Sequence, residues 1–151
     1  MQIFDLSKIR DVIEIQEFQS DLVYDGYGHS HNIAINTDTG VAYTAGTGRS
    51  ASPRGIHALD ISEPLSPNLL IEYPEFGYTH DAQIVIYNGP DEDHKGKEIY
   101  VGSNEDRVVF VDVSDKSSPV LISEFFYDHQ YTHQAWLTED HRFLLMGDEL
   151  D

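Results

Sequence analysis

The chain contains no cysteine among its 151 residues. A disulfide framework, a thiolate nucleophile and a thiolate metal site are therefore excluded. Basic residues are also few, because 27 Asp and Glu stand against 9 Lys and Arg and give a formal net charge of −18. A surface of that sign repels nucleic acid and anionic lipid, so neither is an expected partner.

Long apolar runs are missing as well. No stretch approaches the ~18 apolar residues of a membrane-spanning helix, so we expect no transmembrane segment. The start, MQIFDLS, lacks the basic and apolar regions of a signal peptide. No stretch places apolar residues at helical spacing. Instead, short runs rich in Val, Ile, Tyr and Phe alternate with Gly, Pro, Asn, Asp and Ser, a texture that predicts an all-β chain.

What the sequence does contain is an internal repeat. An apolar-Asp-apolar-Ser pattern occurs as IFDLS at 3–7, ALDIS at 58–62 and FVDVS at 110–114, at intervals of about 50 residues. A second, independent signal keeps the same period. Its members are His31, His80 and His133.

Within one period the sequence predicts four strands. Starting from the second histidine, they are expected at 80–87, 98–103, 107–114 and 120–127. Four antiparallel strands in a unit of about 50 residues are typical of a β-propeller blade, whereas a β-sandwich would not repeat its signals on a fixed period. The predicted division is the end of one blade at 1–30, whole blades at 31–79 and 80–132, and the start of another at 133–151.

The predicted fold is therefore a fragment of roughly three propeller blades. Propellers close with about 4 to 8 blades, and three would leave unpaired strand edges. We expect the last two strands of a blade within 2–18 and the first two of another within 133–148. The expected partners are the remaining blades of a longer chain. In the alternative, the half-blade at one end of a chain pairs with the half-blade at the other end of a neighbouring copy. Two copies would then close a six-bladed ring.

Three stretches, at 77–106, 111–119 and 131–151, resemble the LVIVD-repeat propellers and, more narrowly, the choice-of-anchor B proteins. The resemblance implies a β-propeller exported to the bacterial cell surface or beyond, with its anchor elsewhere in the full-length chain. It implies no defined activity. It also implies a cysteine pair around 46–62, which this chain lacks.

The repeated histidines form the main candidate site. In a blade, the second strand ends where the first begins, so each histidine shares one face of the disk with the hairpin after strand two. Imidazole nitrogens beside carboxylates are suitable ligands for divalent Zn, Cu, Mn or Fe. The candidate metal ligands are His31, His80, His133, Glu105, Asp148 and Glu149. The expected hydrogen-bonding neighbours are Asn32, Asp81 and Gln134. In the alternative interpretation, the histidines only satisfy backbone groups between blades.

The polar loop at 88–98 is a second candidate site. Its carboxylates offer hard oxygen ligands for Ca²⁺ from Asp91, Asp93 and Glu98, although the spacing is not that of a helix-loop-helix calcium motif. A solvated loop is the alternative. Aromatic side chains are expected between blades rather than in a ligand platform. They are Tyr100, Phe110, Phe125, Phe126 and Trp136.

No catalytic constellation appears in the sequence, which leaves open whether the protein is an enzyme. The first hypothesis is an extracellular or cell-surface scaffold that binds a protein or glycan partner, with a metal ion at the histidine face. The second is a metal-dependent, copper-type oxidoreductase that uses the same histidines. A third is a structural component of a surface assembly.

Overall fold

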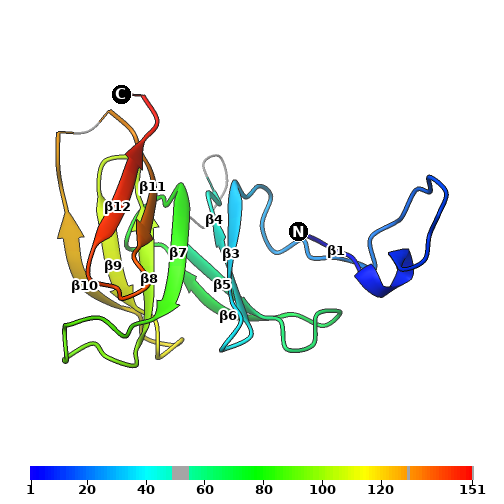
Figure 1. Ribbon diagram of the computed structural model, residues 1–151, viewed down its shortest axis with the longest axis horizontal. Helices are drawn as coiled ribbons and strands as arrows, with labels where there is room; N and C mark the ends of the chain where they lie inside the picture. The colour runs from blue at the N-terminus through cyan, green and yellow to red at the C-terminus, as the bar shows by residue number, and fades with distance from the viewer. Residues whose placement is uncertain (49–54, 129, 151) are drawn as a thin grey trace.

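The computed structural model describes residues 1–48, 55–128 and 130–150. Over these residues the protein is built from two four-stranded and two two-stranded antiparallel sheets, with one short 3-10 helix (Figure 1). The first two-stranded sheet pairs β1 (Gln2–Ile3) with β2 (Leu22–Val23), and the helix η1 (Leu6–Ile9) lies between them in the chain. No helix in this described part is long and apolar enough to cross a membrane.

The two complete sheets have the strand order of propeller blades, with each strand paired to the next along the chain. The first sheet consists of β3 (Asn32–Asn36), β4 (Val41–Ala45), β5 (Ile56–Asp60) and β6 (Asn68–Tyr73). The second consists of β7 (Asp81–Ile86), β8 (Glu98–Ser103), β9 (Val108–Asp112) and β10 (Val120–Phe125). The all-β expectation and the four predicted strands of this repeat are confirmed.

The last two-stranded sheet pairs β11 (Thr132–Leu137) with β12 (Leu144–Asp148). The first strands of successive sheets, β3, β7 and β11, lie next to one another in the middle of the molecule, and β10 lies on its outside (Figure 1). This arrangement puts the start of each repeat on the inside, as the repeat predicts.

The repeated aspartate has a local structural role at the end of the third strand. In each repeat its Oδ1 accepts a hydrogen bond from the backbone N–H two residues later, at 2.9 Å from Ser7 to Asp5, 2.8 Å from Ser62 to Asp60 and 3.0 Å from Ser114 to Asp112. This short-range bond turns the chain out of the strand. The apolar-Asp-apolar-Ser pattern therefore marks a third strand and its exit turn.

Two apolar cores lie between the sheets. The first joins the two complete sheets through residues including Ile56, Ala58, Val109 and Val111, together with the fully buried Tyr43. The second joins β8 and β9 to the two-stranded sheet through Ile99, Val101, Val108, Ala135 and Leu137. Alternate residues of a strand face the sheets on its two sides, because side chains along a strand alternate between its two faces.

Two expectations need correction. Of the five aromatic residues predicted to lie between blades, Tyr100 is buried and Phe110 is half-buried, but Phe125, Phe126 and Trp136 are exposed. Trp136 alternates with the buried Ala135 and Leu137, so it lies on the other face of β11, where no described sheet covers it.

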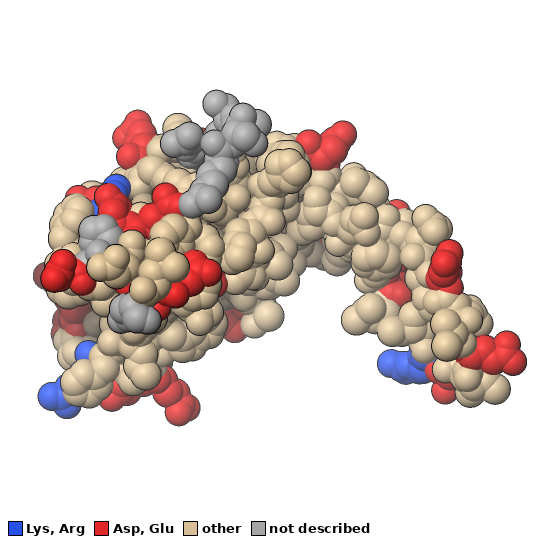
Figure 2. Space-filling model, turned by 90° about the horizontal axis from the view of Figure 1, so that it is seen from above, with Lys and Arg blue, Asp and Glu red and all other residues tan. Residues whose placement is uncertain are grey.

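The segment 2–18 also differs from the expected pair of strands. Residues 2–3 form its one strand, and the partner strand lies further along, at 22–23. Residues 1–27, which include these two strands and the 3-10 helix, form an arm that projects away from the four-stranded sheets (Figures 1 and 2). Part of the stretch 46–62, where the cysteine pair is absent, lies outside the described residues.

Candidate functional site

The three repeated histidines are held at the same end of successive first strands. The backbone N–H of His31 donates to the carbonyl of Ala45 at 2.9 Å, and that of His80 donates to the carbonyl of Ser103 at 2.7 Å. Both carbonyls belong to the last residue of the neighbouring second strand. The antiparallel pairing therefore fixes each histidine beside the hairpin that follows strand two, as the sequence predicts.

The rings of these histidines form a continuous row. His31 stacks on His80 with ring centroids 4.0 Å apart and planes inclined by 29°, and the centroids of His80 and His133 are 4.9 Å apart. The ring of Tyr131 meets His80 edge-on at 5.2 Å. Successive sheets thus bring residues that lie about 50 positions apart in the sequence into direct contact.

Three members of the site present ligand atoms at metal-binding range. One donor atom from each of His80, His133 and Glu149 lies within 4.8 Å of the other two, and His133 Nδ1 is 3.6 Å from Glu149 Oε2. This His133 nitrogen is buried and has no hydrogen-bond partner among the described residues. A buried polar nitrogen without a partner is costly unless something binds it.

The environment of His80 favours a neutral imidazole. Burial lowers its pKa, the hydrogen bond to the His133 carbonyl opposes this, and the neighbouring histidine rings lower the pKa further. The ring Nδ1 lies 3.3 Å from that carbonyl oxygen, so Nδ1 carries the proton and donates it. This tautomer leaves Nε2 with a free lone pair, which is the form in which histidine ligates a metal.

Of the three expected hydrogen-bonding neighbours, Asp81 connects the other two. Its Oδ1 accepts from Asn32 Nδ2 at 2.7 Å and from the backbone of Ala82 at 2.7 Å. Its Oδ2 accepts from Gln134 Nε2 at 3.4 Å. One carboxylate therefore links the starts of β3, β7 and β11, directly behind the histidine row.

The remaining predicted ligands have other partners. Asp148 accepts hydrogen bonds from the backbone N–H groups of residues 130, 131 and 150 and from the hydroxyl of Tyr127. Burial raises its pKa, but these hydrogen bonds outweigh that effect and lower the pKa below its ordinary value. Glu105 accepts from the Tyr131 hydroxyl at 2.8 Å. Both carboxylates thus hold the hairpins around the site.

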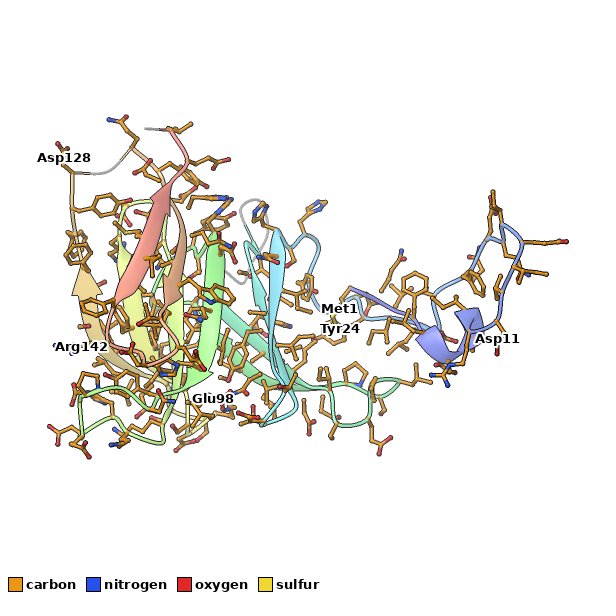
Figure 3. All side chains as sticks on the ribbon, viewed as in Figure 1. Met1, Asp11, Tyr24, Glu98, Asp128 and Arg142 are labelled. Atoms are coloured by element: carbon orange, nitrogen blue, oxygen red, sulfur yellow. The ribbon has the colours of Figure 1, made fainter. Side chains whose placement is uncertain are left out.

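The carboxylates of the 88–98 loop do not converge. Asp91 and Asp93 are exposed at the end of β7 opposite the histidines, and Asp91 Oδ1 accepts from the backbone N–H of Asp93 at 3.1 Å. Glu98 is buried between the sheets instead (Figure 3). Within the described residues, the one group of three or more possible ligands is that of His80, His133 and Glu149.

Sequence reasoning missed the structural role of Glu98. Its Oε1 accepts from Asn36 at 2.9 Å, from Thr39 at 3.1 Å and from the Tyr43 hydroxyl at 3.0 Å. Its Oε2 lies 2.6 Å from Lys116 Nζ. Burial and the charge of Glu98 raise the pKa of Tyr43 far above its ordinary value, so its hydroxyl remains a donor. No periodic pattern marks these partners, since three of the four donors lie in a different repeat from Glu98.

Comparison with known families identifies residues 95–126 as an LVIVD repeat. The matched segment contains β8, β9 and β10 of the second complete sheet. No curated protein matches the chain. The matched repeat and the blade-like sheets indicate a repeat protein with a propeller-type scaffold.

Proposed function

We propose that the protein is a binding scaffold that holds one divalent transition-metal ion on its histidine face. The observation that carries this proposal is the convergence of His80, His133 and Glu149, with donor atoms within 4.8 Å of one another. Two imidazoles and one carboxylate form a donor set that suits zinc and other borderline metals. The unpartnered nitrogen of His133 supports the proposal, because an ion would supply its missing partner.

The residues behind the ligands would orient them. His80 donates through Nδ1 to the His133 carbonyl, so the two ligands fix each other's position. Asp81 holds the backbone at the start of β7 and its neighbours on β3 and β11. His31, stacked on His80, shields one side of that ring. A metal ion held by three protein ligands keeps open positions, and an oxygen or nitrogen of a protein or glycan partner would bind there.

The experiment is a calorimetric titration of the metal-free protein with Zn²⁺ at pH 7.5. The proposal expects one ion per chain, with binding lost in His133→Gln and weakened in the isosteric Glu149→Gln. Asp81→Asn should weaken binding less than His133→Gln does, because Asp81 hydrogen-bonds to residues beside the ligands and to no ligand itself. The control is Asp91→Asn, which removes an exposed carboxylate of the distant loop and should leave the affinity unchanged.

Two results would contradict the proposal. Affinity that is equal in wild type and His133→Gln would mean that the histidines only support the inter-sheet contacts. Copper retained through purification, with redox turnover that His133→Gln abolishes, would favour the oxidoreductase hypothesis over a scaffold.

We also propose that the scaffold acts outside the cell, as a choice-of-anchor B protein. The LVIVD repeat at 95–126 and the resemblance of the flanking stretches support this location. Labelling of intact cells with an antibody to the protein tests it. Signal that appears only after the cells are lysed would reject it.

A further inference from the structure

A polar hollow of about 290 Å³ lies at the end of the inner strands opposite the repeated histidines. The first strand of each complete sheet, with the turn that follows it, contributes consecutive residues, 35–38 and 84–86. Asn88 after β7 and His141 from the hairpin of β11 and β12 complete the lining. Three successive repeats therefore build the hollow, whose strands β3 and β7 lie side by side (Figure 1).

The backbone edges of β3 and β7 form much of this hollow. Residues 84, 85 and 86 all line it, and because side chains along a strand alternate between two faces, they can do so together only along the edge of β7. In the described sheets β3 and β7 are terminal strands, so each has a sheet neighbour on its other edge alone. Such an edge presents N–H donors and C=O acceptors. The hollow therefore offers hydrogen-bonding groups of both kinds.

His141 adds a donor of defined tautomer. Its Nδ1 accepts a hydrogen bond from the backbone N–H of Asn88 at 3.0 Å, so the proton of the neutral ring is on Nε2. The ring of Tyr87 lies beside it, with centroids 5.6 Å apart and planes inclined by 32°, which limits its rotation. Asp38, whose side chain is exposed in the turn after β3, adds a carboxylate acceptor.

The charges of the lining exclude several classes of ligand. Among the described residues no Lys or Arg lines the hollow, and its one carboxylate is that of Asp38. An anion would find no cationic partner there, and Ca²⁺ sites usually combine several carboxylates. The ligand that fits is neutral, both donates and accepts hydrogen bonds, and has an apolar face for Ile35, Ile84 and Ile86. A sugar ring has these properties, because its hydroxyl groups are donors and acceptors and its C–H groups are apolar.

We propose that this hollow binds one neutral sugar unit of a glycan. The volume is near the lower end of the range for small-molecule sites, about 300–1,000 Å³, which agrees with a single ring. His141 Nε2 donates to a sugar oxygen, Asp38 accepts from a hydroxyl group, and the edges of β3 and β7 hydrogen-bond to the remaining hydroxyls. The site lies at the end opposite the histidine face and does not depend on a metal ion.

Nuclear magnetic resonance of the isotope-labelled protein, with a chelator present, tests the proposal. The probes are the methyl glycosides of glucose, galactose, mannose and N-acetylglucosamine. At least one of them should cause saturable shifts of the backbone amides at 35–38, 84–88 and 141, with no shift at His133 on the opposite face.

Two variants and a matched control locate the binding. Asp38→Ala and His141→Asn should each weaken it about 5-fold, the effect of losing one hydrogen bond. Asn tolerates the positive φ of His141, +50°, and keeps an acceptor for the N–H of Asn88. The control is Glu63→Ala, which removes an exposed carboxylate from the loop between β5 and β6 and should leave the affinity unchanged.

The circular dichroism spectrum of each variant should match that of the wild type, so that a lost shift reports lost binding. No saturable shift with any of the four glycosides would overturn the proposal. Affinities of Asp38→Ala and His141→Asn equal to that of the wild type would also overturn it, because the sugar would then bind elsewhere.

Discussion

At the scale of single residues, Glu98 connects the two complete sheets outside the apolar cores. It joins the hairpin of β3 and β4 to the start of β8 through three neutral donors and the Lys116 ammonium. Glu98→Ala leaves that ammonium and the buried donors unpaired, so we expect a loss of about 3–5 kcal/mol in the free energy of unfolding. Urea denaturation measures it.

A matched control separates burial from charge. Glu92 pairs with Lys95 at 2.9 Å on the surface, and Glu92→Ala should cost less than about 1 kcal/mol because exposed ion pairs contribute little. Equal effects of the two substitutions would mean that the Glu98 network does not hold the sheets together.

At the scale of elements, Gly46 permits the close approach of β4 to the start of β3. Its φ is +72°, and an added Cβ would lie 2.8 Å from the backbone nitrogen of His31. Gly96 has a similar φ of +79°, but nothing lies within 4 Å of its Cβ position. Gly96→Ala should therefore cost about 1–2 kcal/mol for the backbone conformation alone. Gly46→Ala should cost about 1–3 kcal/mol more, because it also overpacks.

The difference between the two glycine variants is measured from their urea midpoints, at equal slope of the transition. A smaller loss for Gly46→Ala than for Gly96→Ala would show that the turn before β3 moves freely, and would remove the geometric basis for the position of His31.

The elements themselves could be predicted from the sequence because their signals are local. Alternating apolar residues and turn residues mark each strand, and the repeated aspartate sets the exit turn of every third strand. The period of about 50 residues then predicts that equivalent residues, such as the three histidines, lie on neighbouring sheets.

Contacts between repeats could not be predicted in the same way. Glu149 rather than Asp148 presents its carboxylate to the histidines, because Asp148 already accepts hydrogen bonds from the hairpin backbone. The burial of Glu98 depends on donors from another repeat. The size and aromatic character of Trp136 predict a place in a core, but its side chain lies on the exposed face of β11.

At the scale of the whole molecule, the pH dependence of stability should follow the buried histidine of β5, His57. His57 on β5 is buried, and its Nε2 lies 3.2 Å from the hydroxyl of Tyr24, which belongs to the arm (Figure 3). Tyr27 meets its ring edge-on at 5.2 Å, and Glu72 is the charged residue opposite it on β6. Burial lowers the pKa of His57, against the opposing effect of Glu72.

The sign of the effect follows from proton linkage. Because the pKa of His57 is lower in the folded state than its ordinary value of about 6.5, the unfolded chain binds more protons below that pH. The contribution of the neutral His57 ring to the free energy of unfolding is therefore complete above about pH 6.5. This contribution is lost as the pH drops toward the folded-state pKa. Its slope should approach about 1.4 kcal/mol per pH unit for this one group. Carboxylates with lowered pKa values, such as Asp112, change the free energy of unfolding with pH only near pH 4 and below.

Urea denaturation between pH 7.5 and 5, with a chelator present, measures this slope. His57→Gln removes the titrating ring while keeping a polar side chain, so its stability should be lower at pH 7.5 but should vary less with pH across the same interval. Since Tyr24 and Tyr27 of the arm cover the ring, protonation of His57 should also loosen the arm. Amide exchange at β1 should then accelerate at pH 5 in the wild type and not in His57→Gln. An unchanged slope in the variant would mean that other groups control the acid sensitivity, and that the arm is held by its strand pairing rather than by the neutral form of His57.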